Sequence, residues 1–329
     1  FQMSLFKIRA FAAGNAASLL GSIARGGLQF MLVIWLAGIW LPLHGYDFAD
    51  TPLWAGIYML PLTAGFLIAG PISGTLSDRY GQRLFATSGL LLAALCFVGL
   101  MLLPVNFSYW VFALLIFGNG VGSGLFASPN TSAIMSSVPA RHRGSASGMR
   151  STFQNSGMAL SIGIFFSLMI AGLASTLPRT LTSGLTAQGV PAAVATHVSH
   201  LPPVSTMFAA LLGYNPIQNL LAPSHVLAHL PAHNVAVLTG RQFFPHLISA
   251  PFHHGLVIVF TAAAIMSVTG ALVSLLRGKQ FYYDDKVPSV DRSAAMVPNG
   301  LSLSSPAPGM SGATPTAPAR RDSESAPGG

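Results

Sequence analysis

Charged residues are scarce in this chain. Asp, Glu, Lys and Arg make up 7% of its 329 residues, whereas a soluble domain carries roughly one quarter. Apolar residues make up 52%. This composition excludes an ordinary soluble domain and predicts an integral membrane protein that contacts the lipid bilayer. The net charge of +8 comes from basic residues scattered singly between apolar runs, so it indicates membrane orientation, and no nucleic-acid partner is expected.

Cysteine is almost absent. The single Cys96 excludes a disulfide framework and a metal–cysteine site. His225, His229 and His233 recur every four residues, but Pro231 interrupts the helix they would share, and no carboxylate or cysteine lies nearby. We therefore expect no metal site and no cofactor. No nucleophile–base pair and no paired carboxylates stand in a plausible site, so an enzyme is not expected.

Long apolar runs dominate the chain, and six of them are long enough to cross a bilayer. They cover about residues 11–41, 52–73, 84–103, 109–128, 145–171 and 252–276. The expected fold is an all-α integral membrane bundle of six transmembrane helices within 11–283, after a cytoplasmic lead at 1–10. We expect a long outer loop at 176–251, between helices five and six. A Ser-, Pro-, Ala- and Gly-rich tail at 284–329 is expected to be disordered and cytoplasmic.

The basic residues predict the orientation of the chain. Of its Lys and Arg residues, all except Arg25, Arg179 and Arg241 fall in the lead, two basic loop regions or the tail, which alternate onto the same side. Cytoplasmic segments carry this excess, so both ends of the segment are predicted to be cytoplasmic, in a multi-pass protein of the plasma (cytoplasmic) membrane. The chain opens at Phe1 rather than at methionine, which suggests a fragment of a longer protein.

The first apolar run carries a polar stripe. Asn15, Ser18, Ser22, Arg25 and Gln29 follow one another at spacings of three, four, three and four, which places them on one helix face. An unpaired cation at mid-depth costs several kcal/mol or more, so this face is interpreted as lining a watery cavity. The alternative is a structural arginine whose guanidinium is satisfied by backbone carbonyls.

Two further runs supply candidates for the same substrate pathway. Asn119 and Ser123 share a helix face in the fourth run, within the glycine-rich G-N-G-V-G-S-G, which indicates close helix packing rather than phosphate binding. Gln154 lies on a polar stripe of the fifth run, with Asn155 and Arg150 beside it.

The segment Gly74–Arg83, G-T-L-S-D-R-Y-G-Q-R, joins the second and third runs. We interpret it as a short loop that acts as a moving joint. Gly74 and Gly81 allow close backbone approach, and Asp78 can accept hydrogen bonds at the start of a neighbouring helix. Arg79 and Arg83 can pair with carboxylates or helix carbonyls. The alternative is a plain connector that follows the positive-inside rule.

This pattern resembles the signature loop of the major facilitator superfamily, in which Gly74, Asp78, Gly81 and Arg83 would form a conformational latch. The later stretch from Pro129 to Gly148 (P-N-T-S-A-I-M-S-S-V-P-A-R-H-R-G-S-A-S-G) resembles the fourteen-helix multidrug-efflux branch, where a similar cytoplasmic loop belongs to the second half. In it, Arg141, Arg143 and Gly144 are the candidate loop residues. The resemblance covers about Leu5–Tyr283.

The resemblance implies the C-terminal half of a secondary active transporter, that is, the second six-helix bundle of a major facilitator fold. Its implied activity is proton-coupled efflux of drugs or small amphipathic molecules by alternating access, as in antibiotic resistance. The partners would be the substrate, the proton and a missing N-terminal half of six or eight helices. No carboxylate falls within a predicted run, so the proton-carrying acid is expected in that missing half. Arg25 could bind an anionic substrate or pair with that acid. The alternatives are a half-size transporter that works as a homodimer with a second copy, and a non-transporting receptor or regulator.

Overall fold

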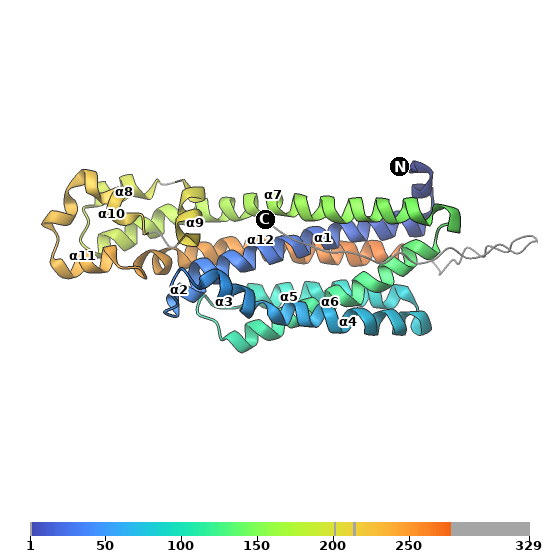
Figure 1. Cartoon of the computed structure of the whole chain (residues 1–329). Coiled ribbons are helices and arrows are strands. Elements are labelled where there is room, and N and C mark those ends of the chain that lie inside the picture. The colour runs from blue at the N-terminus through green and yellow to red at the C-terminus, as the bar shows by residue number, and fades with distance from the viewer. Residues whose placement is uncertain (1, 201, 213–214, 278–329) are drawn as a thin grey trace, which may run out of the picture. The chain divides into compact units, whose positions relative to one another are not determined.

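The computed structural model describes residues 2–200, 202–212 and 215–277 (Figure 1). The described part is helical without strands, and it contains six helices long and apolar enough to cross a membrane. These spans are Arg9–Leu43, Thr51–Tyr80, Gln82–Met101, Tyr109–Ser136, Ala140–Ala187 and Phe243–Leu275. The predicted all-α membrane bundle of six spans is thereby confirmed. The predicted tail at 284–329 and the bundle residues 278–283 lie outside the described residues.

Several spans combine more than one helical segment. The first consists of α1 (Arg9–Trp35), a π-helical turn η2 (Leu36–Trp40) and α2 (Leu41–Leu43). The second consists of α3 (Thr51–Tyr58) and α4 (Leu60–Tyr80). The third, fourth and sixth are single helices, and the fifth is α7 preceded by the short turn η3. Their bounds are Gln82–Met101 for α5, Tyr109–Ser136 for α6, Ala140–His142 for η3, Arg143–Ala187 for α7 and Phe243–Leu275 for α12. A short helix η1 (Met3–Lys7) precedes α1.

Helix packing places α1 inside the bundle. It packs against α6, α7 and α12, while α4 and α5 both pack against α6, and α12 closes against α5 (Figure 1). The apolar stretch of α1 is buried over most of its surface, whereas α4 leaves most of its own exposed. Asn15, Ser18 and Ser22 of the polar stripe on α1 are therefore buried against neighbouring helices.

The glycine run of α6 allows two neighbours to approach at once. A Cβ on Gly120 would collide with the carbonyl oxygen of Leu62 on α4, and one on Gly124 would lie 2.9 Å from the carbonyl oxygen of Phe66. On the other side, a Cβ on Gly122 would lie 2.6 Å from the carbonyl oxygen of Gly89 on α5. The predicted role of this run in close helix contact is therefore seen directly, because backbone meets backbone on both sides.

Two helices extend further than the apolar pattern predicts. Helix α7 continues to Ala187 and α12 begins at Phe243, so both ends of the stretch 176–251 are helix rather than loop. Pro178 and Pro251 lie inside these helices. Proline weakens the helical prediction, yet membrane helices accept it where neighbouring helices and local adjustments satisfy the freed carbonyl.

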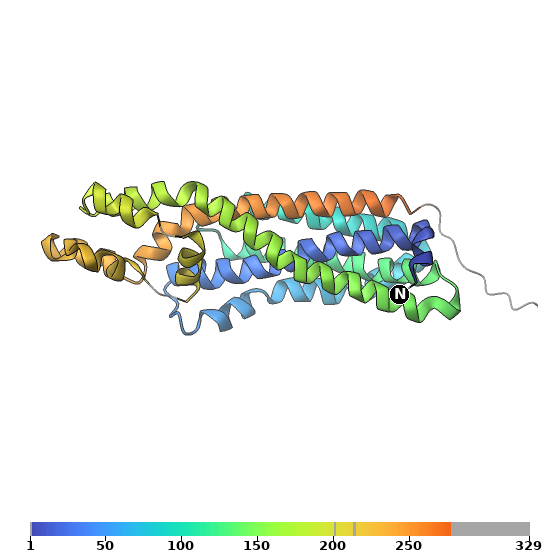
Figure 2. The same cartoon turned by 90° about the horizontal axis from the view of Figure 1, so that it is seen from above.

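The rest of that stretch also folds into helices. They are α8 (Ala192–Ser199), α9 (Pro203–Leu211), α10 (Ile217–Leu221) and α11 (Ala232–Thr239), with the short turns η4 (Ala222–Ser224) and η5 (Val226–His229). Buried residues such as Leu181, Val198, Leu221 and Phe244 belong to one hydrophobic cluster that continues into the bundle. Both views show these helices at the end of the bundle opposite the N-terminus (Figures 1 and 2). The described part of the stretch is a helical cap.

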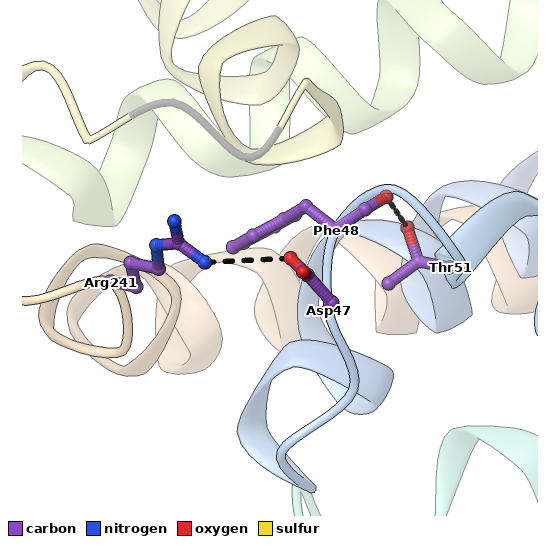
Figure 3. Close-up of polar contacts among 4 residues, drawn as sticks. All are labelled: Asp47, Phe48, Thr51 and Arg241. Carbon is purple, nitrogen blue, oxygen red and sulfur yellow. Dashed lines mark hydrogen bonds and ion pairs between the residues drawn. The ribbon is translucent and has the colours of Figure 1, made fainter.

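One ion pair links this cap region to the loop after α2. Arg241 Nη1 lies 3.4 Å from Asp47 Oδ1, and close by the Thr51 hydroxyl donates to the Phe48 carbonyl oxygen at 3.0 Å (Figure 3). Both charged side chains are largely exposed, at 80% and 64%. An exposed pair contributes about 0–1 kcal/mol, so the apolar cluster, and not this pair, holds the cap in place.

Candidate functional site

A cavity of about 250 Å³ lies inside the bundle, and all six spans contribute to its wall. Helices α1 and α6 each supply three polar side chains, α7 supplies two and α12 supplies one, while α4 and α5 add apolar surface. The lining residues whose side chains bear on the chemistry are Ser18, Ser22, Arg25, Phe66, Leu90, Phe97, Asn119, Ser123, Phe126, Asn130, Arg150, Gln154 and Ser267. No Asp or Glu belongs to this lining.

Arg25 faces the cavity from the middle of α1. Its guanidinium carbon lies 5.5 Å from the centre of the Phe66 ring on α4, a cation–π contact that contributes about 0.5–2 kcal/mol. Within the described residues Arg25 has neither a hydrogen bond nor an ion pair. The alternative of an arginine satisfied by backbone carbonyls is therefore not what the structure shows.

Arg150 brings a second positive charge to the same cavity. The sequence pattern places Arg150 beside the polar stripe of the fifth run, although the count of basic residues groups it with the preceding loop. Helix α7 begins at Arg143, so Arg150 lies about two turns inside the helix and lines the cavity. Its Nε is buried and finds no acceptor among the described residues. The side chain is only half-buried, so the guanidinium lies at the cavity surface rather than in a closed core.

Asn130 ties α6 to α1 at one side of the cavity. Its side-chain nitrogen donates to the Ser18 hydroxyl at 2.6 Å and to the Gly14 carbonyl oxygen at 3.3 Å. Ser18 and Asn130 are 5% and 1% exposed, so both groups depend on each other for hydrogen bonding. The cavity wall therefore has a fixed polar link between two helices.

Replacing Asn130 with alanine is expected to lower the free energy of unfolding by about 1–3 kcal/mol, because Ser18 and the Gly14 carbonyl are then left buried without this donor. Thermal unfolding of the detergent-purified protein measures the loss. Asn155→Ala is the matched control, since Asn155 is exposed on α7 and is expected to leave the unfolding midpoint unchanged. Equal midpoints for the two variants would contradict the bridging role.

Six of the nine predicted pathway residues lie together around the cavity: Ser18, Ser22, Arg25, Asn119, Ser123 and Gln154. Asn119 also donates to the Ala93 carbonyl oxygen at 3.4 Å and so links α6 to α5. The other three are elsewhere. Asn15 is buried and donates to the Phe11 carbonyl oxygen of its own helix at 2.9 Å.

Gln29 and Asn155, the remaining two, are exposed on the bundle surface. Gln29 lines a separate groove of about 340 Å³ between α1 and α7, where Phe30 and Met158 are its neighbours. Neither residue reaches the cavity.

Comparison with known proteins places this bundle in a family. Residues 3–162 match the family model described as Major Facilitator Superfamily. The methyl viologen resistance protein SmvA of Salmonella typhimurium is 32% identical over 192 residues, 57% of this chain and 36% of SmvA. The chain belongs to the major facilitator superfamily. The resemblance found in the sequence is thus confirmed, and the protein is a multi-pass membrane protein with a major facilitator bundle.

Other relatives within the superfamily carry names from drug resistance and export. The multidrug resistance protein Stp of Mycobacterium tuberculosis is 31% identical over 200 residues, 60% of this chain and 34% of Stp. The tetracenomycin C resistance and export protein of Streptomyces glaucescens is 22% identical over 277 residues, 84% of this chain and 46% of that protein. The chain therefore matches between about a third and a half of the length of these relatives.

The superfamily signature segment differs in form from the predicted loop. Helix α4 continues to Tyr80 and α5 begins at Gln82, so Gly81 alone is the joint between them. Gly81 has φ +97°, a left-handed conformation that favours glycine. Gly74 lies within α4, where a Cβ would come 2.8 Å from the Ser128 hydroxyl of α6. The joint is consequently a sharp corner between two helices and not a flexible loop.

The three charged residues of this signature segment lie on the surface of the bundle. Asp78, Arg79 and Arg83 are exposed, and they have no partner within the described part of the chain. Gln82 is instead buried, and its side chain donates to the Ser132 hydroxyl of α6 at 2.7 Å. The signature thus combines a corner fixed to α6 with three charges left available to another surface.

The second basic segment sits between α6 and α7. Arg141 belongs to η3, and Arg143 and Gly144 are the first two residues of α7. All three are exposed. The α4–α5 corner, this segment, the N-terminus and the end of α12 share one end of the bundle (Figures 1 and 2).

Several residues of the site carry too weak a signal to be found in the sequence. Asn130 follows Ser123 by seven residues and Ser267 precedes Ser274 by seven, but this spacing does not distinguish a cavity wall from an ordinary helix contact. Phe66, Phe97 and Phe126 do not differ by pattern from core phenylalanines. Arg150 did have a signal, because Gln154 follows it by one helical turn.

Proposed function

We propose that this chain is the C-terminal six-helix half of a fourteen-helix secondary active transporter that exports small amphipathic molecules, drugs among them. The observation that carries the proposal is the cavity lined by residues of all six spans, with two guanidiniums in its wall. A substrate site of this kind lies between two six-helix halves, and rocking of one half against the other gives alternating access. The resistance and export names of the relatives support the direction of transport.

Proton coupling is part of the proposal, and it places a requirement on the rest of the protein. Coupling needs a titratable carboxylate in the membrane, and no Asp or Glu lines the cavity. Among the described acids, Asp47 and Asp50 lie in the loop after α2, and Asp78 is exposed in the last turn of α4. The coupling acid is therefore assigned to the first half of the transporter.

The orientation follows from the basic residues. Lys7, Arg9, Arg79, Arg83 and Arg141 belong to the end of the bundle shared by the N-terminus and the signature corner. By the positive-inside rule this end faces the cytoplasm, and the helical cap faces outward. The proposed location is the cytoplasmic membrane, with both ends of this segment on the cytoplasmic side.

Transport by the intact native protein in proteoliposomes tests the proposal. Vesicles with an acidic lumen are given a panel of cationic, neutral and anionic amphiphiles, methyl viologen among them. We expect at least one member to accumulate several-fold, and accumulation to disappear when nigericin collapses the pH gradient. Binding without accumulation would favour the receptor or regulator. Gradient-driven accumulation by residues 1–329 alone would instead favour the homodimer.

A further inference from the structure

The cavity holds an excess of positive charge that the bundle does not neutralise. Arg25 and Arg150 both line it, and no Asp or Glu does. Like charges repel more strongly at low dielectric than in water, and several kcal/mol are lost for each buried ion that lacks a counter-charge. A bound anion removes both costs at once.

The wall also offers neutral hydrogen-bonding groups that are not already used. Ser22, Ser123 and Gln154 line the cavity and make no hydrogen bond to the other described residues. Ser22 precedes Arg25 by one turn of α1, and Gln154 follows Arg150 by one turn of α7. Each guanidinium thus has a neutral hydrogen-bonding group one turn away on its own helix, and the two oxygens of a carboxylate can accept hydrogen bonds from both kinds of group.

The remaining wall is aromatic and aliphatic. Phe66, Phe97, Phe126 and Leu90 line the same cavity. A small inorganic anion makes no use of such a surface, whereas the ring of an aromatic acid gains about 25 cal/mol for each Å² of apolar area that leaves water. The volume of about 250 Å³ limits the ligand part held by this half to one small ring system.

We propose that the cavity binds a small aromatic or otherwise amphipathic carboxylate, whose negative group lies between Arg25 and Arg150 and whose ring packs on the phenylalanines. The inference rests on the proposed function only in taking this cavity as the substrate pathway, because binding itself needs no transport. The inferred substrate class does not include the dication methyl viologen, because two guanidiniums would repel it.

Equilibrium binding of salicylate to the intact native protein in detergent tests the inference. Salicylamide, which has the same ring without the negative charge, is the comparison ligand. We expect salicylate to bind at least tenfold more tightly than salicylamide. We also expect Arg25→Gln or Arg150→Gln to raise the Kd for salicylate at least tenfold and to leave the Kd for salicylamide nearly unchanged.

Each arginine has a matched control on its own helix. Arg9→Gln on α1 and Arg179→Gln on α7 remove exposed guanidiniums outside the cavity, and both are expected to keep wild-type binding. Equal affinity for salicylate and salicylamide would overturn the inference. So would an absence of salicylate binding together with a lower unfolding midpoint of Arg25→Gln without ligand, since the arginine would then be held by a carboxylate from the rest of the protein. If the protein binds salicylate as expected but transports no amphiphile, the transport proposal is contradicted and the binding inference stands.

Discussion

Replacing Gly120 with alanine is expected to lower the free energy of unfolding by about 1–3 kcal/mol, although alanine favours a helix over glycine by about 1 kcal/mol. The added Cβ would collide with the carbonyl oxygen of Leu62 and lie 3.0 Å from the backbone nitrogen of Phe66. Both obstacles are main-chain atoms of α4, so no side-chain rotation relieves the overlap. The two helices must separate, and α6 also loses its close fit against α5 on its other side.

Gly163→Ala is the matched control for this result. Gly163 lies in the transmembrane part of α7, and a Cβ there meets nothing within 4 Å. The same substitution is therefore expected to leave the unfolding midpoint unchanged or to raise it. Thermal unfolding in detergent, followed by the fraction of monodisperse protein, measures both variants. Stabilisation of Gly120→Ala would show that α4 and α6 do not approach as closely as described.

The polar stripe of α1 shows which part of the site sequence periodicity predicts and which part it does not. From Asn15 to Gln29 the stripe covers fifteen residues, which is about 21 Å of helix, and its 3.5-residue repeat drifts by about 20° per heptad. The middle of the stripe, Ser18 to Arg25, therefore faces the cavity, while both ends turn away from it or lie beyond it. Periodicity identifies a face, but the depth of a cavity depends on helices far away in the sequence.

The remaining features of the site depend on tertiary packing. The sequence already places Arg150 inside the fifth run, but its position in the cavity wall depends on how α7 packs against α1. The hydrogen bonds of Asn130 depend on the crossing of α1 and α6, where a Cβ on Gly14 would come 2.5 Å from Ile134. The cap helices are short and interrupted by prolines, and they are stabilised by contacts with α7 and α12 that no local pattern reveals.

Replacing Asp78 with asparagine is expected to reduce transport by about tenfold without reducing stability. A carboxylate in the last turn of a helix faces the negative end of the macrodipole, which costs about 0.3–1 kcal/mol. Asp78 is exposed and makes no contact within the described residues that repays this cost. An unfavourably placed charge that no contact in its own bundle offsets is expected to have a functional contact outside that bundle. For Asp78 the expected contact is the first half of the transporter, on which the signature segment would act as a latch.

Asp78→Asn should therefore lower the transport rate without lowering the unfolding midpoint. The unfolding midpoint is expected to stay constant or rise, because an unfavourable charge has been removed from the end of α4. The initial rate of amphiphile accumulation is expected to fall, because a latch that loses one to two kcal/mol shifts the conformational equilibrium by a factor of about 5–30. Asp50→Asn is the control: Asp50 is exposed before α3 and caps it with no side-chain hydrogen bond. If Asp78→Asn lost stability and activity together, Asp78 would be a structural residue of this bundle. If it kept full transport, the corner at Gly81 would be a connector with no latch.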